Sequence, residues 1–248
     1  MEWRERDSVR WLEAELPGAV AAFTSRIGGV GDGEFAKLNL GMLTGDSPEN
    51  VSENRRIVSE ALDRDPDGIL FGYQEHGNTV AEQDVAPSPN AWLASSGPPP
   101  AADGQATANP ALTPLVQVAD CLPVALRGER GVAMLHCGWR GLAAGIIGLG
   151  VERIGASAAA IGPGIGPCCF EVGSEVLERF EGLGAGIAHG RMLDLPEVVR
   201  RLLAEAGVEQ VESTDLCTSC ERDLFFSHRR DQGRTGRQAG LVWLDGDG

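Results

Sequence analysis

The chain has 248 residues, of which 42% are hydrophobic, and a formal net charge of −15. This length and apolar content are enough for one large domain with a continuous core, and we expect a single domain over residues 1–248. Nucleic acids and anionic membrane surfaces attract positively charged proteins, so the negative charge argues against either as the main partner. A small-molecule substrate is expected instead.

The N-terminal residues and the cysteines bear on cellular location. Residues 1–7 are charged where a signal peptide would have its apolar stretch, and the longest weakly polar run, Gly141–Val151, is shorter than the roughly 20 residues that span a bilayer. We therefore expect a cytoplasmic protein. The six cysteines are then expected to be free thiols or metal ligands, because a reducing compartment prevents disulfides.

The first predicted elements are a helix and a loop. Ser47-Pro48 is typical of an N-cap followed by proline at the first helical position, and it predicts an amphipathic helix over Glu49–Leu62. Residues 87–114 are rich in Pro, Ala, Ser and Gly, with Pro98-Pro99-Pro100 near the centre. We expect an exposed excursion from the domain here; an interdomain linker is the alternative.

Short apolar runs bounded by glycine, proline or charge predict several buried strands. They are Leu115–Val118, Leu122–Leu126, Val132–Leu135, Ala158–Ile161 and Leu241–Leu244. Residues 140–150 have the apolar content of a helix, so the glycine-flanked turn before them would place His136 at a strand end. Asp194-Leu195-Pro196-Glu197 is an aspartate variant of the capping box and predicts a helix that ends at Gly207.

Three glycine-flanked segments carry candidate metal ligands. His76, Cys121 and His136 together offer two imidazoles and a thiolate, the donors that zinc or copper selects, with a fourth position left open for water or substrate. Their spacing matches no local metal motif. Residue type alone is equally consistent with a turn histidine, a small buried cysteine and a core histidine.

The chain resembles a known family over almost its whole length. The resemblance rests on Thr24–Val30, Leu38–Gly41, Gln74–Gly77, Ala119–Pro123, Leu135–Gly141, Ile161–Gly173, Phe225–Asp231 and Gly233–Gln238. This family is named multicopper polyphenol oxidoreductase or laccase-domain proteins, also peptidoglycan editing factor, and has been reassigned to purine nucleoside metabolism.

The resemblance implies a fold and a ligand set. The fold is α+β, a layered α/β/β/α sandwich with mixed sheets, and the metal ligands fall on His76, Cys121 and His136, with zinc expected and copper possible. Cys137 stands where the family commonly has alanine, which leaves two candidate thiols. Because side chains alternate along a strand, Cys137 is expected to point away from His136, and we retain Cys121.

Other residues are candidates for catalysis and binding. Asp120 and Glu171 are candidate carboxylates for orienting a ligand or moving a proton, although most carboxylates in so acidic a chain are simply solvated. Four arginines lie within residues 228–237, and such a cluster is suited to phosphate unless it pairs with surface carboxylates. The proposed substrate- or phosphate-binding set is Arg26, Asn39, Gly164, Arg229 and Arg230.

Two further motifs are less specific. Residues 161–173 are glycine-rich, but Pro163 and Pro167 remove amide donors and no P-loop lysine follows, so a turn that shapes the pocket wall is expected. Cys217-Thr218-Ser219-Cys220 is a single C-x-x-C, a weak signal for structural zinc or redox chemistry. The adjacent pair Cys168-Cys169 suits neither a normal disulfide nor a zinc ribbon.

The family implies an enzyme that cleaves adenosine, inosine or S-methyl-5′-thioadenosine with phosphate and also deaminates adenosine. A conventional multicopper oxidase needs more imidazoles than four histidines provide, but a single copper at a His₂Cys site stays open as an oxidoreductase. The H-x-E signature of zinc deaminases is absent. Two further functions stay open: a hydrolase in which Cys121 is a nucleophile activated by His136, and an editing role toward peptidoglycan precursors.

Overall fold

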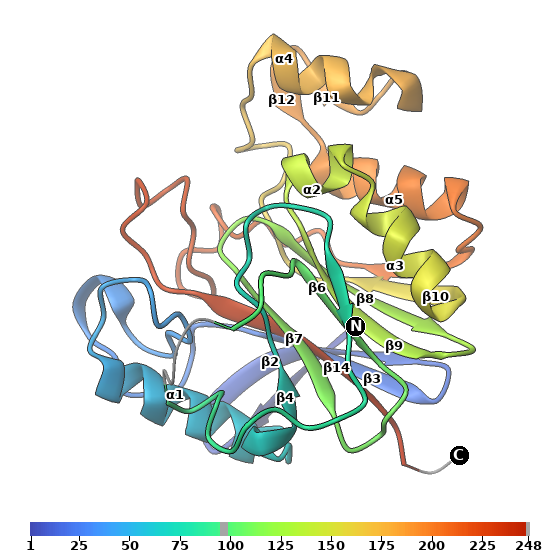
Figure 1. Ribbon diagram of the computed structural model, residues 1–248. Helices are drawn as coiled ribbons and strands as arrows, with labels where there is room; N and C mark the ends of the chain where they lie inside the picture. The colour runs from blue at the N-terminus through green and yellow to red at the C-terminus, as the bar shows by residue number, and fades with distance from the viewer. Residues whose placement is uncertain (95–98, 247–248) are drawn as a thin grey trace.

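The computed structural model describes residues 1–94 and 99–246. Two large mixed β-sheets pack face to face, and helices cover the outer face of each sheet (Figure 1). This is a single-domain α+β fold with the expected α/β/β/α layers. Within those two ranges, no helix has both the length and the apolar character needed to cross a membrane.

The first sheet has the strand order β1-β2-β3-β14-β7-β4. Its strands are Glu2–Arg6 (β1), Val9–Leu16 (β2), Ala19–Thr24 (β3), Ile69–Leu70 (β4), Thr113–Val118 (β7) and Gln238–Leu244 (β14). The C-terminal strand β14 lies between β3 and β7, so the end of the chain completes the centre of this sheet.

The second sheet has the strand order β13-β10-β8-β9-β6-β5. Its strands are Val80–Glu82 (β5), Gly104–Thr107 (β6), Leu122–Gly128 (β8), Gly131–Cys137 (β9), Ala156–Ile161 (β10) and Gln210–Ser213 (β13). A small separate hairpin joins Ala188–His189 (β11) to Met192–Leu193 (β12).

The helices lie outside the two sheets (Figure 1). The α-helices are Pro48–Ala61 (α1), Trp139–Ala143 (α2), Ile146–Ile154 (α3), Ser174–Leu177 (α4) and Leu195–Glu205 (α5), and short 3₁₀ helices occupy Gly33–Phe35, Pro66–Gly68 and Glu178–Leu183. In Figure 1, α1 lies against the first sheet, whereas α2, α3 and α5 lie over the second.

Apolar side chains fill the spaces between the layers. Phe23, Val116, Met134 and Val242 belong to a fully buried cluster contributed by strands of both sheets. A second cluster packs α3 and α5 against β8, β9 and β10, and a third packs α1 against the first sheet. Burial of this apolar surface provides most of the driving force for folding and holds the strand ends that carry the site.

The predicted helices and strands are confirmed. The Ser47 hydroxyl accepts a hydrogen bond from the Asn50 amide at the start of α1, and the Asp194 carboxylate accepts one from the Glu197 amide at the start of α5. The apolar stretch after His136 forms two helices instead of one, because Gly145 adopts a left-handed backbone conformation with φ of 88° between them.

The prediction of an exposed excursion over residues 87–114 was wrong for much of the segment. Strand β6 is buried between β5 and β9, and Trp92 is also buried. The guanidinium of Arg55 lies 4.0 Å from the Trp92 ring and donates to its carbonyl oxygen at 2.6 Å. Small residues let this backbone pack inside the sheet, so a composition typical of loops concealed a strand. Residues 95–98, including Pro98, lie outside the described residues.

Candidate metal centre and its pocket

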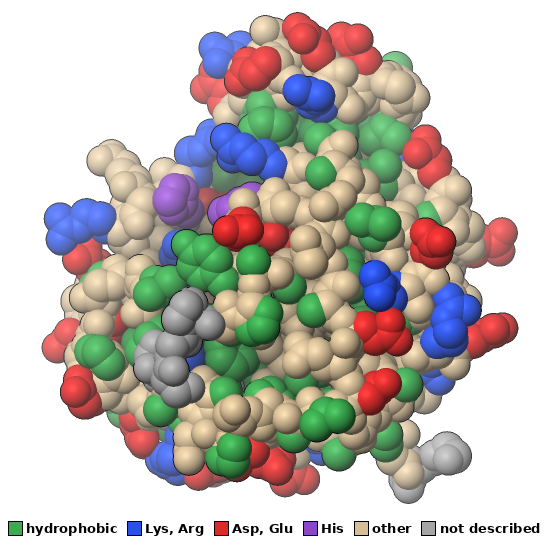
Figure 2. All heavy atoms as spheres, viewed as in Figure 1, with side chains coloured by type: hydrophobic (Ala, Val, Ile, Leu, Met, Phe, Trp, Pro, Cys, Tyr) green, Lys and Arg blue, Asp and Glu red, His purple; other side chains and the backbone are tan. Residues whose placement is uncertain are grey.

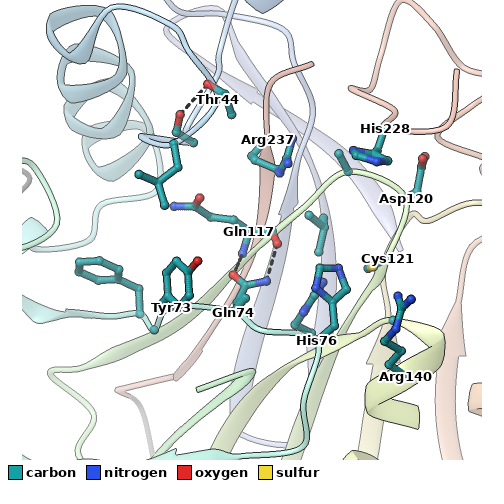
Figure 3. A pocket seen from close by; sticks show the side chains of 18 of the residues that line it. Thr44, Tyr73, Gln74, His76, Gln117, Asp120, Cys121, Arg140, His228 and Arg237 are labelled. Carbon is teal, nitrogen blue, oxygen red and sulfur yellow. Dashed lines mark hydrogen bonds between the residues drawn. The ribbon is translucent and has the colours of Figure 1, made fainter. Parts of the chain in front are cut away.

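Three loop or strand-end positions bring the predicted metal ligands together. Cys121 comes directly before β8 and His136 is next to last in β9; the two strands pair with Pro123 opposite His136. His76 lies in the loop before β5 with a left-handed φ of 61°. The potential ligand atoms of His76, Cys121 and His136 all lie within 4.8 Å of one another. Figure 3 shows His76 and Cys121 facing the same space.

The Asp103 carboxylate holds two of these ligands in place. Its Oδ1 atom lies 2.8 Å from Nδ1 of His136, which leaves Nε2 of that ring free to bind a metal. The same carboxylate accepts hydrogen bonds from the backbone amides of Glu75, His76 and Gly77 at 2.8–3.1 Å. A carboxylate that orients a histidine in this way is the usual outer partner of a metal-bound imidazole.

Asp103 was missed by sequence analysis, which considered Asp120 and Glu171 for this role. It precedes β6, inside the segment predicted to be an exposed excursion, and nothing in its local sequence marks it as buried. Its side chain is nevertheless only 3% exposed. An aspartate at the start of a glycine- and alanine-rich strand would have been a candidate only if that strand had been recognised.

The surroundings of Cys121 favour its thiolate, which is the form that binds a metal. Burial by itself would raise the pKa of the Cys121 thiol, but the adjacent His136 imidazolium and hydrogen bonds from His136 and His76 lower it to about 6. Burial would lower the pKa of His136, but the Cys121 thiolate and the Asp103 carboxylate raise it to about 9. The protein without metal therefore holds a thiolate–imidazolium pair, and a bound cation would replace the imidazolium proton.

The side chains of Cys121 and His76 leave little space for any residue larger than glycine at position 138. A Cβ atom there would lie 2.9 Å from Sγ of Cys121 and 3.3 Å from Cδ2 of His76. Cys137 is buried on the opposite side of β9 within the apolar core and is not part of the ligand group, as its alternation with His136 predicted. Burial raises the pKa of the Cys137 thiol well above its ordinary value. The donor set and its surroundings thus fit one metal ion.

The three ligands open into a cavity of about 840 Å³. In Figure 2, histidine side chains lie beside basic side chains in a hollow of the surface. The side-chain amide of Gln74 joins one wall to the backbone of Gln117: it donates to the Gln117 carbonyl oxygen at 2.7 Å and accepts from the Gln117 amide at 2.8 Å (Figure 3). Basic and aromatic residues make up much of the remaining lining: Arg55, Arg140, Arg229, Arg237, Phe71, Tyr73, Trp139, Phe170 and His228.

Two of the predicted binding or catalytic residues line this cavity, Asp120 and Arg229. The Asp120 carboxylate accepts hydrogen bonds from the Thr218 hydroxyl and the Arg229 amide, both at 2.7 Å. The Arg229 guanidinium lies 5.2 Å from the Phe170 ring and donates to the carbonyl oxygen of Glu171 at 2.8 Å. The Asp120 side chain therefore fixes the backbone that carries Arg229.

Arg26 and Arg230 lie outside the lining of this cavity. The Arg26 guanidinium donates to the Ala36 carbonyl oxygen and lies 4.3 Å from the Phe226 ring. Arg230 forms an ion pair with Asp231 at 2.8 Å and donates to backbone carbonyl oxygens, including that of Thr218 at 2.9 Å. Both guanidinium groups are thus engaged in holding loops together.

Asn39, Gly164 and Glu171 also lie outside the lining. Asn39 is fully buried, and its Oδ1 atom accepts from the amides of Gly41 and Arg237 at 3.0 and 2.8 Å, so it positions two residues that do line the cavity. A Cβ atom on Gly164 would lie 2.5 Å from the Leu122 side chain, which explains the glycine by packing. The Glu171 carboxylate is exposed and lies 3.3 Å from Arg191.

The fold and site define a class of protein: a layered α+β domain in which two histidines and a cysteine, a candidate metal-binding set, lie at one end of a basic and aromatic pocket. Residues 20–245 match the family described as "Multi-copper polyphenol oxidoreductase laccase", and the chain belongs to this family.

Curated relatives and solved structures agree with this assignment. The chain is 39% identical to "Purine nucleoside phosphorylase YfiH" of Shigella flexneri, covering 92% of this chain and 96% of the relative. It is 37% identical to "Purine nucleoside phosphorylase PA4543" of Pseudomonas aeruginosa, covering 94% and 98%. The crystal structure of YlmD from Geobacillus stearothermophilus superimposes with a TM-score of 0.89 at 32% identity, covering 98% of each chain.

Proposed function

We propose that this chain is a metal-dependent purine nucleoside phosphorylase that also deaminates adenosine. The observation that carries the proposal is the convergence of His76, Cys121 and His136 at a cavity that also holds basic and aromatic side chains. The names of its relatives, purine nucleoside phosphorylases, support the same assignment. The proposed substrates are adenosine, inosine and S-methyl-5′-thioadenosine, together with phosphate.

The cavity has the size and chemistry for a purine nucleoside together with phosphate. Its volume of about 840 Å³ falls within the range typical of small-molecule sites. Tyr73, Trp139 and Phe170 offer rings for contact with a purine. Arg140 extends from α2 toward the same space as Cys121 (Figure 3), and its permanently charged guanidinium is suited to a phosphate dianion.

Phosphorolysis makes one bond and breaks one. A phosphate oxygen attacks C1′ of the ribose, the C1′–N bond breaks, and its electron pair leaves on the purine nitrogen. We propose that Arg140 and Arg229 bind the phosphate and that Asp120 acts as a positioning residue, because both of its oxygen atoms already accept hydrogen bonds from Thr218 and Arg229. Deamination replaces the amine at C6 of adenosine with oxygen from water, releasing ammonia.

A metal ion held by the two histidines and the cysteine would supply Lewis-acid polarisation at this end of the cavity. Zinc is the proposed ion because three protein ligands with one open position are typical of catalytic zinc sites, and imidazole and thiolate are both zinc donors. Copper accepts the same donors, and metal analysis of the purified protein separates the two.

The test is product analysis with metal-analysed protein. Zinc-loaded enzyme is incubated with adenosine, with and without phosphate, and the products are separated by chromatography. Adenine and ribose 1-phosphate are expected only with phosphate, and inosine in both cases. His76→Ala should abolish both reactions, whereas His189→Ala, which changes an exposed histidine in strand β11, should not. Tightly bound zinc without any turnover would overturn the proposal.

A second candidate function is that of a cysteine hydrolase. Cys121, His136 and Asp103 have the order of contacts found in a nucleophile–base–carboxylate triad, with the His136–Asp103 contact at 2.8 Å and the pKa of Cys121 at about 6. Metal-free protein would then be the active form. Hydrolysis of an ester or amide that is inhibited by added zinc and lost in Cys121→Ser would favour this function over the first.

A further inference from the structure

Four cysteines meet at a second place in the molecule, apart from the His76–Cys121–His136 centre. Cys168 and Cys169 follow β10 in the glycine-rich turn, and Cys217 and Cys220 follow β13. Their four sulfur atoms all lie within 4.8 Å of one another. Within residues 1–94 and 99–246, this group and the His₂Cys group are the two clusters with at least three candidate metal ligands in reach of one ion.

The sulfur positions match a tetrahedral thiolate site. Sγ of Cys220 lies 3.5 Å from Sγ of Cys168 and 3.5 Å from Sγ of Cys169. A zinc ion with four sulfur ligands at about 2.3 Å requires sulfur–sulfur distances of about 3.8 Å. A disulfide would join only two of the four sulfur atoms, at about 2.05 Å. The convergence of all four around one point is what a metal ion requires.

Adjacent cysteines can both face this point because residues 167–169 form a turn, not a strand. In a strand, neighbouring side chains would point to opposite faces. The amides of Cys169 and Phe170 both donate to the Gly166 carbonyl oxygen, at 3.0 and 3.1 Å, which closes the turn. The adjacent spacing of Cys168 and Cys169, which suited no metal motif in the sequence, is therefore compatible with both residues binding one ion.

Backbone amides also arrange the C-x-x-C segment as metal knuckles do. The amides of Cys220 and Glu221 donate to the Cys217 carbonyl oxygen at 3.1 and 2.9 Å, which turns Cys220 back toward Cys217. The Gly166 amide donates to Sγ of Cys217 at 3.2 Å, and such a bond stabilises a thiolate. The two segments are joined directly, since the Thr218 amide donates to the Gly164 carbonyl oxygen at 2.9 Å.

A buried cation lies beside this turn. The Arg230 guanidinium donates to the carbonyl oxygens of Thr218 at 2.9 Å and Ser219 at 3.5 Å. Its side chain is 9% exposed, so its charge is poorly screened by water. The Asp231 carboxylate pairs with this guanidinium at 2.8 Å, so the contribution of Arg230 is to hold the two carbonyl oxygens between Cys217 and Cys220. Arg230, which the arginine cluster suggested for phosphate, thus fixes the backbone of the C-x-x-C turn instead.

We propose that Cys168, Cys169, Cys217 and Cys220 bind one zinc ion as a structural site, distinct from the His₂Cys centre. Four thiolates fill the coordination of zinc and leave no open position for a substrate. Cys168 and Cys220 are exposed, so the ion can enter from solvent without opening the core.

This ion would tie together the two segments that support one wall of the cavity. The Asp120 carbonyl oxygen accepts from the Ile165 amide in the first segment at 2.8 Å, and its carboxylate accepts from the Thr218 hydroxyl in the second at 2.7 Å. Loss of the ion is therefore expected to loosen Asp120 and Arg229 without removing a ligand of the other metal.

The test is the zinc content of full-length protein purified under reducing conditions. The wild type is expected to hold two zinc ions per chain, and Cys168→Ser/Cys220→Ser one. Cys121→Ser should also hold one zinc ion per chain, because it loses the ion of the His₂Cys site and keeps the ion of the four-cysteine site. Cys137→Ser, which changes a buried cysteine outside both clusters, should keep two. One zinc in both the wild type and Cys168→Ser/Cys220→Ser, or a disulfide between two of the four cysteines in fresh wild-type protein, would overturn the proposal.

X-ray absorption at the zinc edge tests the wild type directly, so the result does not depend on whether a variant folds. Two occupied sites should give about 2.5 sulfur ligands per zinc on average, whereas the His₂Cys site alone gives about one. A value near one would refute the four-cysteine site. Neither measurement uses nucleoside turnover, so an inactive protein with two zinc ions would leave this site established and refute only the proposed function.

Discussion

Replacing Asp103 with asparagine tests whether this carboxylate organises the metal centre. In the structure each oxygen accepts two hydrogen bonds: Oδ1 from the His76 amide and His136 Nδ1, and Oδ2 from the amides of Glu75 and Gly77. Asparagine keeps one oxygen and presents an NH₂ group in place of the other. Whichever way the amide is turned, two donors then face another donor.

The expected loss follows from these four contacts. Leaving one buried donor unpaired costs about 1–3 kcal/mol, and the loop around His76 is partly exposed, so two donors should cost about 2 kcal/mol of folding free energy. The uncharged amide also weakens the hold on the His136 ring. Loss of such an outer partner typically lowers metal affinity about 10- to 100-fold, which corresponds to about 1.4–2.8 kcal/mol.

Zinc affinity of Asp103→Asn would be measured by competition with a chromophoric chelator, together with the urea midpoint of unfolding. Asp84→Asn is the matched control, because the Asp84 carboxylate accepts from the Thr107 hydroxyl and the Ala108 amide at the other end of β6, away from the metal ligands. Asp84→Asn should leave zinc affinity unchanged. Wild-type zinc affinity in Asp103→Asn would refute the role given to this carboxylate.

Three other predictions each concern a single residue. Gly138→Ala places a Cβ atom 2.9 Å from Sγ of Cys121, so we expect at least about tenfold weaker zinc binding in the chelator assay; an unchanged affinity would show that the site can shift to make room. Arg140→Ala should raise the KM for phosphate by about tenfold or more, with little change in the KM for nucleoside. Arg153→Ala, which changes an exposed arginine paired with Glu82, should leave both KM values unchanged, and an equal rise in the KM for phosphate in the two variants would remove Arg140 from the phosphate site. Burial would raise the pKa of Asp231, but the ion pair with Arg230 lowers it, so the ion pair stabilises the fold fully above a pH of about 4 and this stability is lost as the pH falls through the lowered pKa. Asp231→Asn should therefore lose less stability on acidification than the wild type, as measured by urea unfolding at a series of pH values. The same loss of stability at low pH in both proteins would contradict this.

Local sequence was enough for the two capped helices and for strands β7, β8, β9, β10 and β14. Ser47 and Asp194 predicted both capped helices because a cap acts only on the first turn, within three residues of its own position. The apolar runs predicted strands because strand burial is read from a few consecutive side chains. Alternation along β9 also predicted correctly that Cys137 would point away from His136, and the structure places it in the apolar core.

The sequence was less informative where the same residue types occur both in buried and in exposed positions. Strand β6 consists of small residues, which are as common in loops as in crowded sheet interiors, so its burial and the role of Asp103 became visible only in the fold. The arginines near the C-terminus were also indistinguishable in the sequence, yet Arg229 lines the cavity while Arg230 holds backbone carbonyl oxygens outside it.

The identity of the His₂Cys ligands followed from resemblance to a family, whereas their convergence was decided by strand pairing, which sets Cys121 beside His136. The four-cysteine cluster shows the same division. Sequence supplied a C-x-x-C and an adjacent pair, and the parallel pairing of β10 with β13, followed by the bridge between Gly164 and Cys217, brought them together. Chemical types and local periodicity are properties of the chain itself, but a site made from distant segments depends on long-range pairing that tertiary packing alone determines.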